Sequence, residues 1–172
     1  MITNQQAEFL LSVPKFIIEN DTKLARKQFD QPFLWNERFY LIGEHEGEIF
    51  EFLWSIWQSP KNTIKICLHN QDDETKMGLF RVDFNSGHNN PAELTELVPA
   101  KFHPFVGKHF SITEHHVHYH VEGYTSLAWA LPIANDDFPH KDLSEQNIVD
   151  IIEEFGKTIN LQTQLLINRR LL

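Results

Sequence analysis

The stretch His115-His-Val-His-Tyr-His-Val121 alternates imidazole rings with apolar and aromatic side chains, and this alternation predicts a β-strand. Side chains of an extended strand point to its two faces in turn, so His116, His118 and His120 are expected on one face. The residues between them suit a hydrophobic core. Histidine changes its charge near neutral pH and is the commonest protein ligand of metal ions. The stretch therefore indicates a sheet and a place on it where chemistry could occur.

A second segment, Leu79-Phe-Arg-Val-Asp-Phe84, alternates in the same way. Its apolar side chains form one face, and Arg81 and Asp83 form the other. If both segments belong to one sheet and cover the same core, Arg81, Asp83 and the three histidines share the opposite face. Antiparallel sheets often leave that second face open. We therefore expect one polar cluster on the open face of a sheet.

Further strands are predicted around these two segments. Short apolar or aromatic runs, separated by turn residues, cover Arg38–Gly43, Ile49–Gln58, Thr63–His69, Lys76–Asn85 and Ser126–Ile133. Such short connections favour an antiparallel meander. Residues 21–36 are polar and predict a connection or a short helix. Residues 86–114 predict a long irregular segment, which we expect to be ordered by its phenylalanines.

Two helices are predicted near the ends of the sequence. Thr3 followed by Gln6 resembles a capping box, and apolar spacing predicts a helix over residues 4–19, interrupted near Pro14. An apolar stripe after Ser144 predicts a second helix that extends towards Leu165. The fold class that follows is α+β, a single domain over residues 1–172. In it, an antiparallel, curved sheet is packed by the N-terminal and C-terminal helices.

Composition limits the classes of function. A formal net charge of −9 disfavours nonspecific DNA binding, which depends on Lys and Arg, but leaves RNA at a local basic patch or a partner protein open. No apolar run approaches the roughly 20 residues that cross a bilayer. The first residues lack the pattern of a secretory signal, and Cys67 is the only cysteine. A cytoplasmic protein without membrane attachment is expected.

The segment Ser86-Gly-His-Asn-Asn-Pro91 follows the Arg81/Asp83 strand and extends the candidate site. Gly87 permits a tight turn there. The residues that we expect to carry chemistry are His116, His118, His88, Arg81 and Asp83. The residues that we expect to contact a substrate are Asn90, His120, Glu122 and Tyr124.

Three kinds of chemistry fit these residues. His116 and His118, with His88 or Asp83, offer the ligands that zinc or a similar ion accepts. Alternatively, two histidines could serve as base and acid in metal-free phosphodiester cleavage, with Arg81 stabilising a phosphate. The third interpretation is a polar sheet face that binds a partner without chemistry. In that case Arg81 and Asp83 form an ordinary ion pair, worth ~0–1 kcal/mol if exposed.

Several short motifs resemble an uncharacterised bacterial domain family. They are Phe52-Leu-Trp-Ser-Ile-Trp57, Phe80-Arg-Val-Asp83, His88-Asn-Asn-Pro91, His116-Val-His-Tyr-His-Val-Glu-Gly-Tyr124 and Ala128-Trp-Ala-Leu-Pro-Ile133. The resemblance covers roughly residues 45–135 in order and spacing. That family implies no established activity.

A weaker likeness connects the chain to TumE-type toxins of bacterial toxin–antitoxin pairs, which also carry Arg-x-Asp and then His-x-His. Where those toxins have a Pro-His step, this chain has Gly87-His88. The likeness implies an RNA-directed toxin with Arg81, His88, His116 and His118 at the matching positions. The leading hypothesis is therefore a nuclease-like hydrolase acting on RNA. The alternative is a non-catalytic binding or inhibitor protein of a mobile element or prophage, whose histidines are structural or bind a metal.

Overall fold

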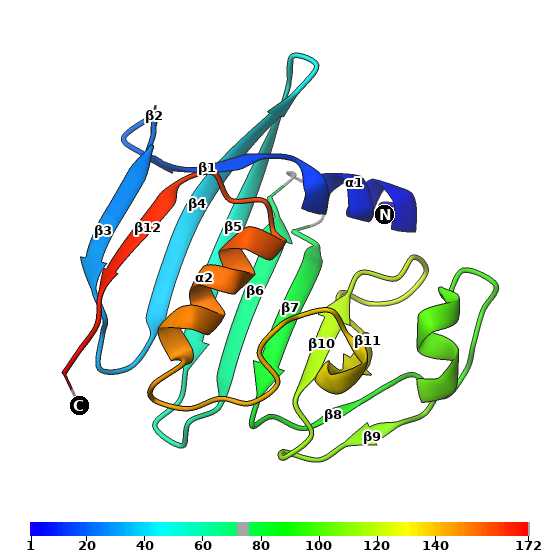
Figure 1. The fold of residues 1–172 in the computed structure, drawn as a ribbon. Coiled ribbons are helices and arrows are strands. Elements are labelled where there is room, and N and C mark those ends of the chain that lie inside the picture. Colours follow the sequence, from blue (N-terminus) through cyan, green and yellow to red (C-terminus); the bar gives the residue numbers. More distant parts are fainter. Residues whose placement is uncertain (72–75, 172) are drawn as a thin grey trace.

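An open sheet of eight strands forms the centre of the computed structural model, which describes residues 1–71 and 76–171. Every neighbouring pair in it is antiparallel, and the spatial order is β11-β10-β7-β6-β5-β4-β1-β2 (Figure 1). The strands are β1 (Lys15–Glu19), β2 (Thr22–Lys23), β4 (Asn36–His45), β5 (Glu48–Gln58), β6 (Ile64–Asn70), β7 (Gly78–Phe84), β10 (His116–Tyr119) and β11 (Trp129–Pro132). The predicted α+β class with an antiparallel sheet is confirmed.

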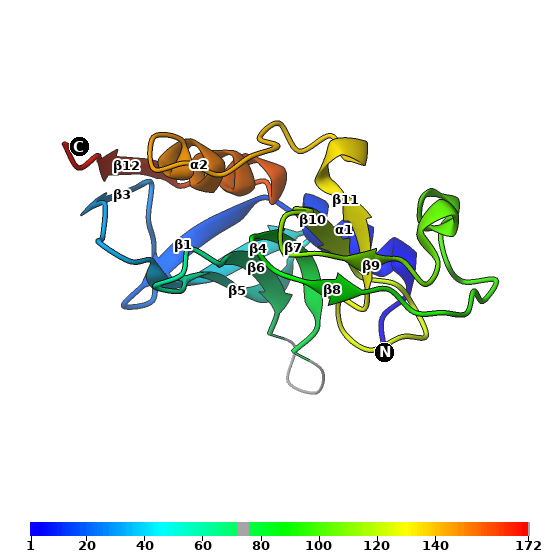
Figure 2. The same cartoon turned by 90° about the horizontal axis from the view of Figure 1, so that it is seen from below.

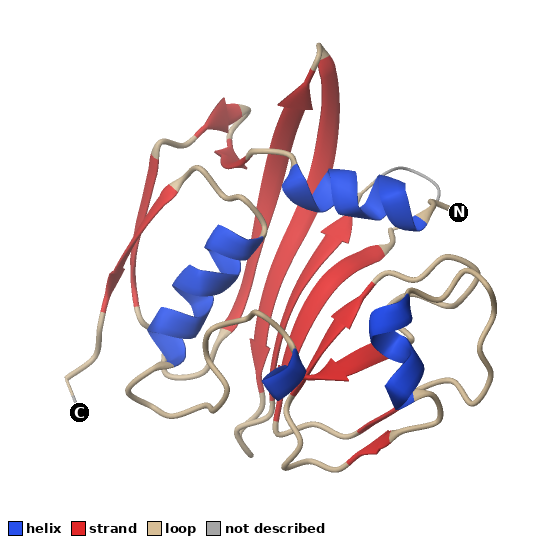
Figure 3. Cartoon of the chain, turned by 45° about the vertical axis from the view of Figure 1, so that its right-hand side comes forward, coloured by secondary structure: helices blue, strands red, loops and turns tan. Residues whose placement is uncertain are grey.

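Two helices cover one face of this sheet, as Figures 1 and 3 show. They are α1 (Asn4–Ser12) and α2 (Ile148–Thr158). Strand alternation turns the large apolar residues of β5 and β7 towards α2, where Phe155 stacks on Trp54 and Phe80 with ring centroids 5.8 and 5.2 Å apart. We call the face turned away from α1 and α2 the outer face. Figure 2, which looks along the strands, shows α2 on the inner side only.

The N-terminal helix is shorter than predicted. The predicted capping box is present, because Thr3 and Gln6 bond each other's backbone N–H groups. However, α1 ends at Ser12, just before Pro14, and residues 15–19 form β1 instead of further helix. Proline disfavours helix in the residue before it, and the β-branched pair that follows packs well on a sheet. The prediction of helix over residues 4–19 is therefore wrong in its second half.

A second small sheet joins two segments that are far apart in sequence. β3 (Arg26–Asp30) lies in the region predicted as a connection, and it pairs in parallel with β12 (Gln164–Asn168). The last helix therefore stops earlier than predicted. Asn160 has a φ of 59°, a left-handed conformation that ends the helical path and directs the chain towards β12.

The fully buried Lys15 connects the ends of α1 and α2. Its Nζ donates hydrogen bonds to the carbonyl oxygens of Leu11 and Val13 at the end of α1 (2.9 and 2.8 Å) and of Ile159 after α2 (2.9 Å). It also lies 4.6 Å from the ring centroid of Phe52. Helix ends leave carbonyl groups without intrahelical partners, and this ammonium group satisfies them for both helices at once.

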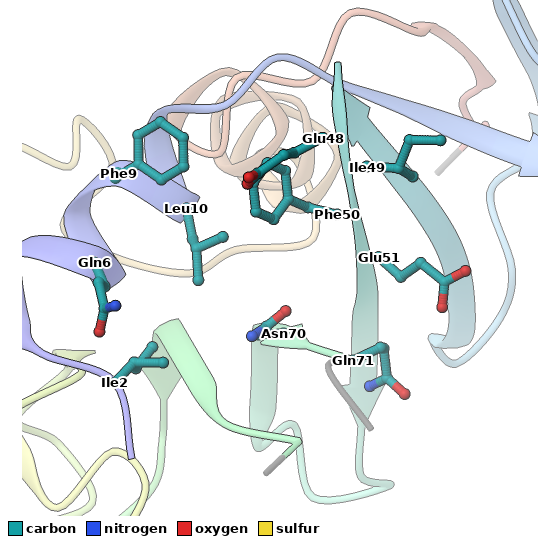
Figure 4. A pocket seen from close by; sticks show the side chains of 10 residues that line it. All are labelled: Ile2, Gln6, Phe9, Leu10, Glu48, Ile49, Phe50, Glu51, Asn70 and Gln71. Carbon is teal, nitrogen blue, oxygen red and sulfur yellow. The ribbon is translucent and has the colours of Figure 1, made fainter. Parts of the chain in front are cut away.

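A hollow of about 710 Å³ lies between α1 and the start of β5. Figure 4 shows Phe9 and Leu10 of α1 facing Phe50 of β5 across it. The polar cluster that the sequence predicts does not line it.

The predicted long segment 86–114 is ordered and contains only short elements. They are β8 (His88–Asn89), the 3-10 helix η1 (Ala100–Phe105) and β9 (His109–Phe110). A second 3-10 helix, η2 (Ile133–Asn135), follows β11. β8 pairs with β9, so the segment forms a hairpin-like excursion beside β7 and β10.

Candidate metal centre

The two alternating segments that the sequence singles out are neighbouring strands. β7 and β10 pair in an antiparallel register that places His116 opposite Asp83 and His118 opposite Arg81. Because directly paired residues of adjacent strands point to the same side, all four side chains emerge on the outer face. The expectation that these groups share one face is therefore met by the geometry.

Asp83, His116 and His118 form a tight cluster. Oδ2 of Asp83 lies 3.5 Å from Nε2 of His116 and 3.4 Å from Nε2 of His118. One ligand atom from each residue can be chosen so that all lie within 4.8 Å of one another. The side chains are 0–1% exposed, so the cluster is screened from water.

Backbone carbonyls fix the orientation of both imidazoles. Nδ1 of His116 lies 2.9 Å from the carbonyl oxygen of Glu114, and Nδ1 of His118 lies 2.9 Å from that of Leu127. A carbonyl oxygen only accepts, so each Nδ1 carries the hydrogen and donates it. Nε2 of each ring faces the carboxylate of Asp83, and in a neutral ring of this kind it carries a lone pair.

Arg81 closes the cluster on its solvent side. Its Nε and Nη2 donate to the two carboxylate oxygens of Asp83 at 2.7 and 2.9 Å, and Nη2 also donates to Nε2 of His118 at 2.9 Å. No such donor reaches His116, whose buried Nε2 has no hydrogen-bond partner among the described residues. Arg81 thus compensates the charge of Asp83 but leaves one acceptor of the cluster unsatisfied.

The electrostatic environment keeps Asp83 ionised and His118 neutral. Burial alone would raise the pKa of Asp83, but the adjacent imidazoles of His116 and His118 and the charge of Arg81 hold it well below its ordinary value. Burial lowers the pKa of His118 to about 4, and Arg81 adds to this effect against the opposing influence of Asp83. At neutral pH, His118 is a neutral ring that is ready to act as a ligand.

Segment 86–114 covers the histidines, so the predicted open polar face is wrong at this point. The ring of Phe110 lies 4.8 Å from that of His116, and the ring of His88 lies 4.6 Å from that of His118. Asn90 secures the segment to β11, because its amide exchanges two hydrogen bonds with the backbone of Ala130. The sequence contained no signal for this cover beyond the length of the segment.

His88 borders the cluster without completing it. Its Nε2 donates to the carbonyl oxygen of Ala128 at 2.9 Å, which leaves Nδ1 as the acceptor. Burial lowers its pKa, while the hydrogen bond to Ala128 opposes that shift. His88 is thus a neutral neighbour, and its ligand atoms are not part of the three-residue group.

Three residues that we expected to contact a substrate lie away from the cluster. Nε2 of His120 donates to the carbonyl oxygen of Ile2 at 2.9 Å. The hydroxyl of Tyr124 donates to the carbonyl oxygen of Glu93, and its ring packs on Trp129. Glu122 is bound through its backbone N–H to Asn4. Asn90 is also fully engaged with backbone groups, so its observed role is to hold the chain.

Cys67 and His69 of β6 are further polar groups on the outer face. Cys67 pairs in register with Arg81, and its Sγ lies 3.5 Å from Nε2 of His69. Burial raises the pKa of the Cys67 thiol to about 12, so it stays protonated. It lies outside the cluster of Asp83, His116 and His118.

A family model described as "Family of unknown function (DUF6978)" matches residues 2–161. The chain belongs to DUF6978. No curated protein matches it, and no solved structure matches it. The membership agrees with the predicted resemblance to an uncharacterised family, whereas the individual motifs and the toxin likeness stay predictions. Among residues 1–71 and 76–171, no helix of this DUF6978 member has the length and apolar character needed to cross a membrane.

The donor set found in this DUF6978 member suits a divalent transition metal. Two imidazole nitrogens and one carboxylate oxygen are the ligands found in many mononuclear zinc sites and in sites for related ions. Metal-binding histidines usually donate their other N–H to a carbonyl or carboxylate, as His116 and His118 do here. The residues present therefore fit a metal ion both in their ligand atoms and in the hydrogen bonds that orient the imidazoles.

Proposed function

We propose that this protein binds one divalent transition-metal ion, with zinc the best fit, through Asp83, His116 and His118. The observation that carries the proposal is the unpartnered Nε2 of His116, which is fully buried and faces a carboxylate oxygen 3.5 Å away. If the ring is neutral, Nε2 and the carboxylate oxygen are both acceptors, and two acceptors repel each other unless a cation lies between them. A metal ion supplies that cation and uses both atoms as ligands.

The low pKa of His118 supports the same conclusion. A ligand histidine must give up its proton before it binds a metal, and His118 has already done so at neutral pH because its pKa is about 4. Arg81 is the group that a metal must partly displace, because its Nη2 now bonds Oδ2 of Asp83 and Nε2 of His118. Arg81 is 24% exposed and lies on the solvent side, so it can withdraw without unfolding the sheet.

Metal analysis tests the proposal directly. The protein, purified without a histidine tag and equilibrated with zinc, should hold one zinc per chain after gel filtration. His116→Gln and His118→Gln should lose it, whereas His120→Gln should keep it because the His120 side chain donates to the carbonyl oxygen of Ile2, outside the cluster. Far-UV circular dichroism verifies that each variant is folded. Retention of zinc in both cluster variants, or no uptake of zinc, manganese, iron, cobalt or nickel by the wild type, contradicts the proposal.

RNA hydrolysis is a second proposal, which the convergence of Arg81, His88, His116 and His118 favours. Nη2 of Arg81 lies 2.9 Å from Nε2 of His118, and the ring of His88 is next to it. The metal-free form of this reaction requires contact between substrate and imidazole, yet His116 and His118 are 0% exposed. Hydrolysis therefore requires movement of Arg81 or of segment 86–114.

The hydrolysis proposal has its own measurement. Fluorescently labelled RNA incubated with wild-type protein should be cut, and His118→Gln should abolish cutting while His120→Gln preserves it. Repeating the assay with EDTA separates the two proposals: activity that survives EDTA requires the metal-free mechanism. Cutting that persists in His118→Gln contradicts the role of His118.

A further inference from the structure

The outer face of the sheet carries a second group of side chains, beyond the metal centre. Alternation along β4, β5 and β6 turns Ile42, Glu51, Cys67 and His69 to this face, and beside them Arg38, Tyr40, Leu53, Ser55, Trp57 and Lys65. We call the last six of these residues the outer patch. None of the described helices or strands crosses β4 and β5 on this side (Figure 2). The outer patch is therefore free to meet another molecule.

Two aromatic rings of the outer patch lie in water. Tyr40 is 60% exposed and Trp57 is 45% exposed, although the same strands bury Phe39 and Trp54 on the inner face. Large exposed aromatic groups often mark interaction sites, and planar ligands can stack on their rings. The two rings come from the adjacent strands β4 and β5. Tyr40 pairs with Leu53, and Trp57 follows Leu53 by four residues along β5.

The cations of the outer patch have no compensating partners. The side chains of Arg38 and Lys65 form no ion pair or hydrogen bond with any described residue, and Lys65 is directly opposite Trp57. Arg38 also lies in one register row with Arg81, three strand spacings or about 14 Å away. In a chain of net charge −9, Arg38 and Lys65 are two cations near the exposed rings, while Asp83, which is opposite Lys65 in register, is bound by Arg81.

Unpaired bases and phosphates match this combination of groups. Bases that are not in a duplex expose their flat faces, which stack on aromatic side chains, while Arg and Lys contact the phosphates. A duplex hides those faces and would leave Tyr40 and Trp57 unused. An acidic peptide would satisfy Arg38 and Lys65 only. RNA is the nucleic acid that most often presents unpaired bases in loops and ends.

We propose that the outer patch binds single-stranded RNA, with bases stacked on Trp57 and Tyr40 and phosphates held by Arg38 and Lys65. This binding depends neither on a metal at Asp83 nor on cleavage. The protein's overall negative charge opposes RNA at long range, so the affinity should fall steeply as salt concentration rises.

Fluorescence anisotropy with a 5′-labelled 12-nucleotide RNA of mixed sequence tests the proposal. EDTA in the buffer keeps the metal centre empty and so separates binding from the proposed metal site. Trp57→Ala should weaken binding about tenfold through loss of a stacked base. Lys65→Glu should weaken it at least as much and make the affinity less dependent on salt.

Two matched variants serve as controls. Phe33→Ala removes an aromatic ring that is 84% exposed but lies outside the outer patch, and Lys157→Glu reverses a cation on α2. Both should bind RNA like the wild type. The proposal is overturned if Phe33→Ala weakens RNA binding as much as Trp57→Ala, or if Lys157→Glu weakens it as much as Lys65→Glu. It is also overturned if duplex RNA or single-stranded DNA of the same sequence binds as tightly as the single-stranded RNA, or more tightly. Dependence on Lys65 without dependence on Trp57 and Tyr40 also overturns it, because it indicates a general anion site.

Discussion

Asp83 and His116 face each other across two neighbouring strands, with Oδ2 of Asp83 3.5 Å from Nε2 of His116 in a region that solvent does not reach. The Nδ1 hydrogen of His116 is already donated to the carbonyl oxygen of Glu114. The other ring nitrogen, Nε2, faces the carboxylate without a hydrogen-bond partner among the described residues. The pair is stable only with a cation nearby, and this requirement leads to the first prediction.

Replacing Arg81 with Met should destabilise the metal-free protein by about 3 kcal/mol, because Asp83 then stays buried without its charge partner. Zinc should recover much of this loss, since a metal ion can take over the compensation of Asp83. Urea unfolding of Arg81→Met with EDTA and with excess zinc gives both values. The same low stability in both conditions would contradict the prediction.

The stability of the metal-free protein should fall in mild acid. The pKa of His118 is about 4 in the fold and 6.5 in its ordinary state, so between these values the unfolded chain binds more protons. Acidification from pH 6.5 to pH 4 therefore favours unfolding, by roughly 3 kcal/mol at the acid end from this group. The lowered pKa of Asp83 continues the trend below its ordinary value of 3.8.

Urea unfolding in EDTA at several pH values between 7 and 4 measures this dependence. His118→Gln removes the titrating ring, so its free energy of unfolding should vary less with pH than that of the wild type. His120→Gln is the control. Parallel curves for the wild type and His118→Gln would show that another group is responsible.

Asn90→Ala should loosen segment 86–114, which covers His116 and His118. The Asn90 side chain forms three hydrogen bonds of 2.8–2.9 Å with the backbone of Phe105 and Ala130, and alanine leaves these buried groups unpaired. The expected cost is about 3 kcal/mol. Hydrogen exchange should accelerate in residues 88–110 more than in α2. Asn89→Ala, an exposed neighbour, is the control, and unchanged exchange in Asn90→Ala would contradict the assignment.

Lys15→Met should destabilise the fold even though methionine fills a similar volume. The change leaves the carbonyl oxygens of Leu11, Val13 and Ile159 without their donor, at an expected total of about 3 kcal/mol. Thermal unfolding measures the effect. Lys23→Met replaces an exposed lysine that pairs with Glu44 at 3.6 Å, and it should change the melting temperature little. Equal stability of Lys15→Met and the wild type would show that the carbonyl groups find other partners.

Local sequence patterns predicted on which face of the sheet each side chain lies. They did not predict whether another segment of the chain covers that face. Strand alternation has a period of two, which is why Arg81, Asp83, His116 and His118 could be assigned to one face before the pairing of β7 and β10 was known. Whether that face met solvent depended on segment 86–114. Its position is set by long-range contacts such as those of Asn90, which no local pattern contains.

The N-terminal region shows a second limit of sequence reasoning. Thr3 and Gln6 predicted the start of α1 correctly, because a capping box is a local device. The three apolar residues 16–18 fit a helix or a strand equally well, and pairing with β4 decided between them. The role of Lys15 could not be predicted either, since one of its three acceptors lies 144 positions away.

The pairing of β3 with β12 has a consequence for how the protein is made. Asp30 and Asn168, hydrogen-bonded across this pair, are 138 positions apart, so a ribosome working at roughly 5–20 residues per second needs on the order of ten seconds to pass from one to the other. During that interval the backbone N–H and C=O groups of β3 cannot yet pair with β12. The nascent chain is then most vulnerable to association with other nascent chains, and its basic residues, Arg26 and Lys27, are the kind of charge that discourages such encounters.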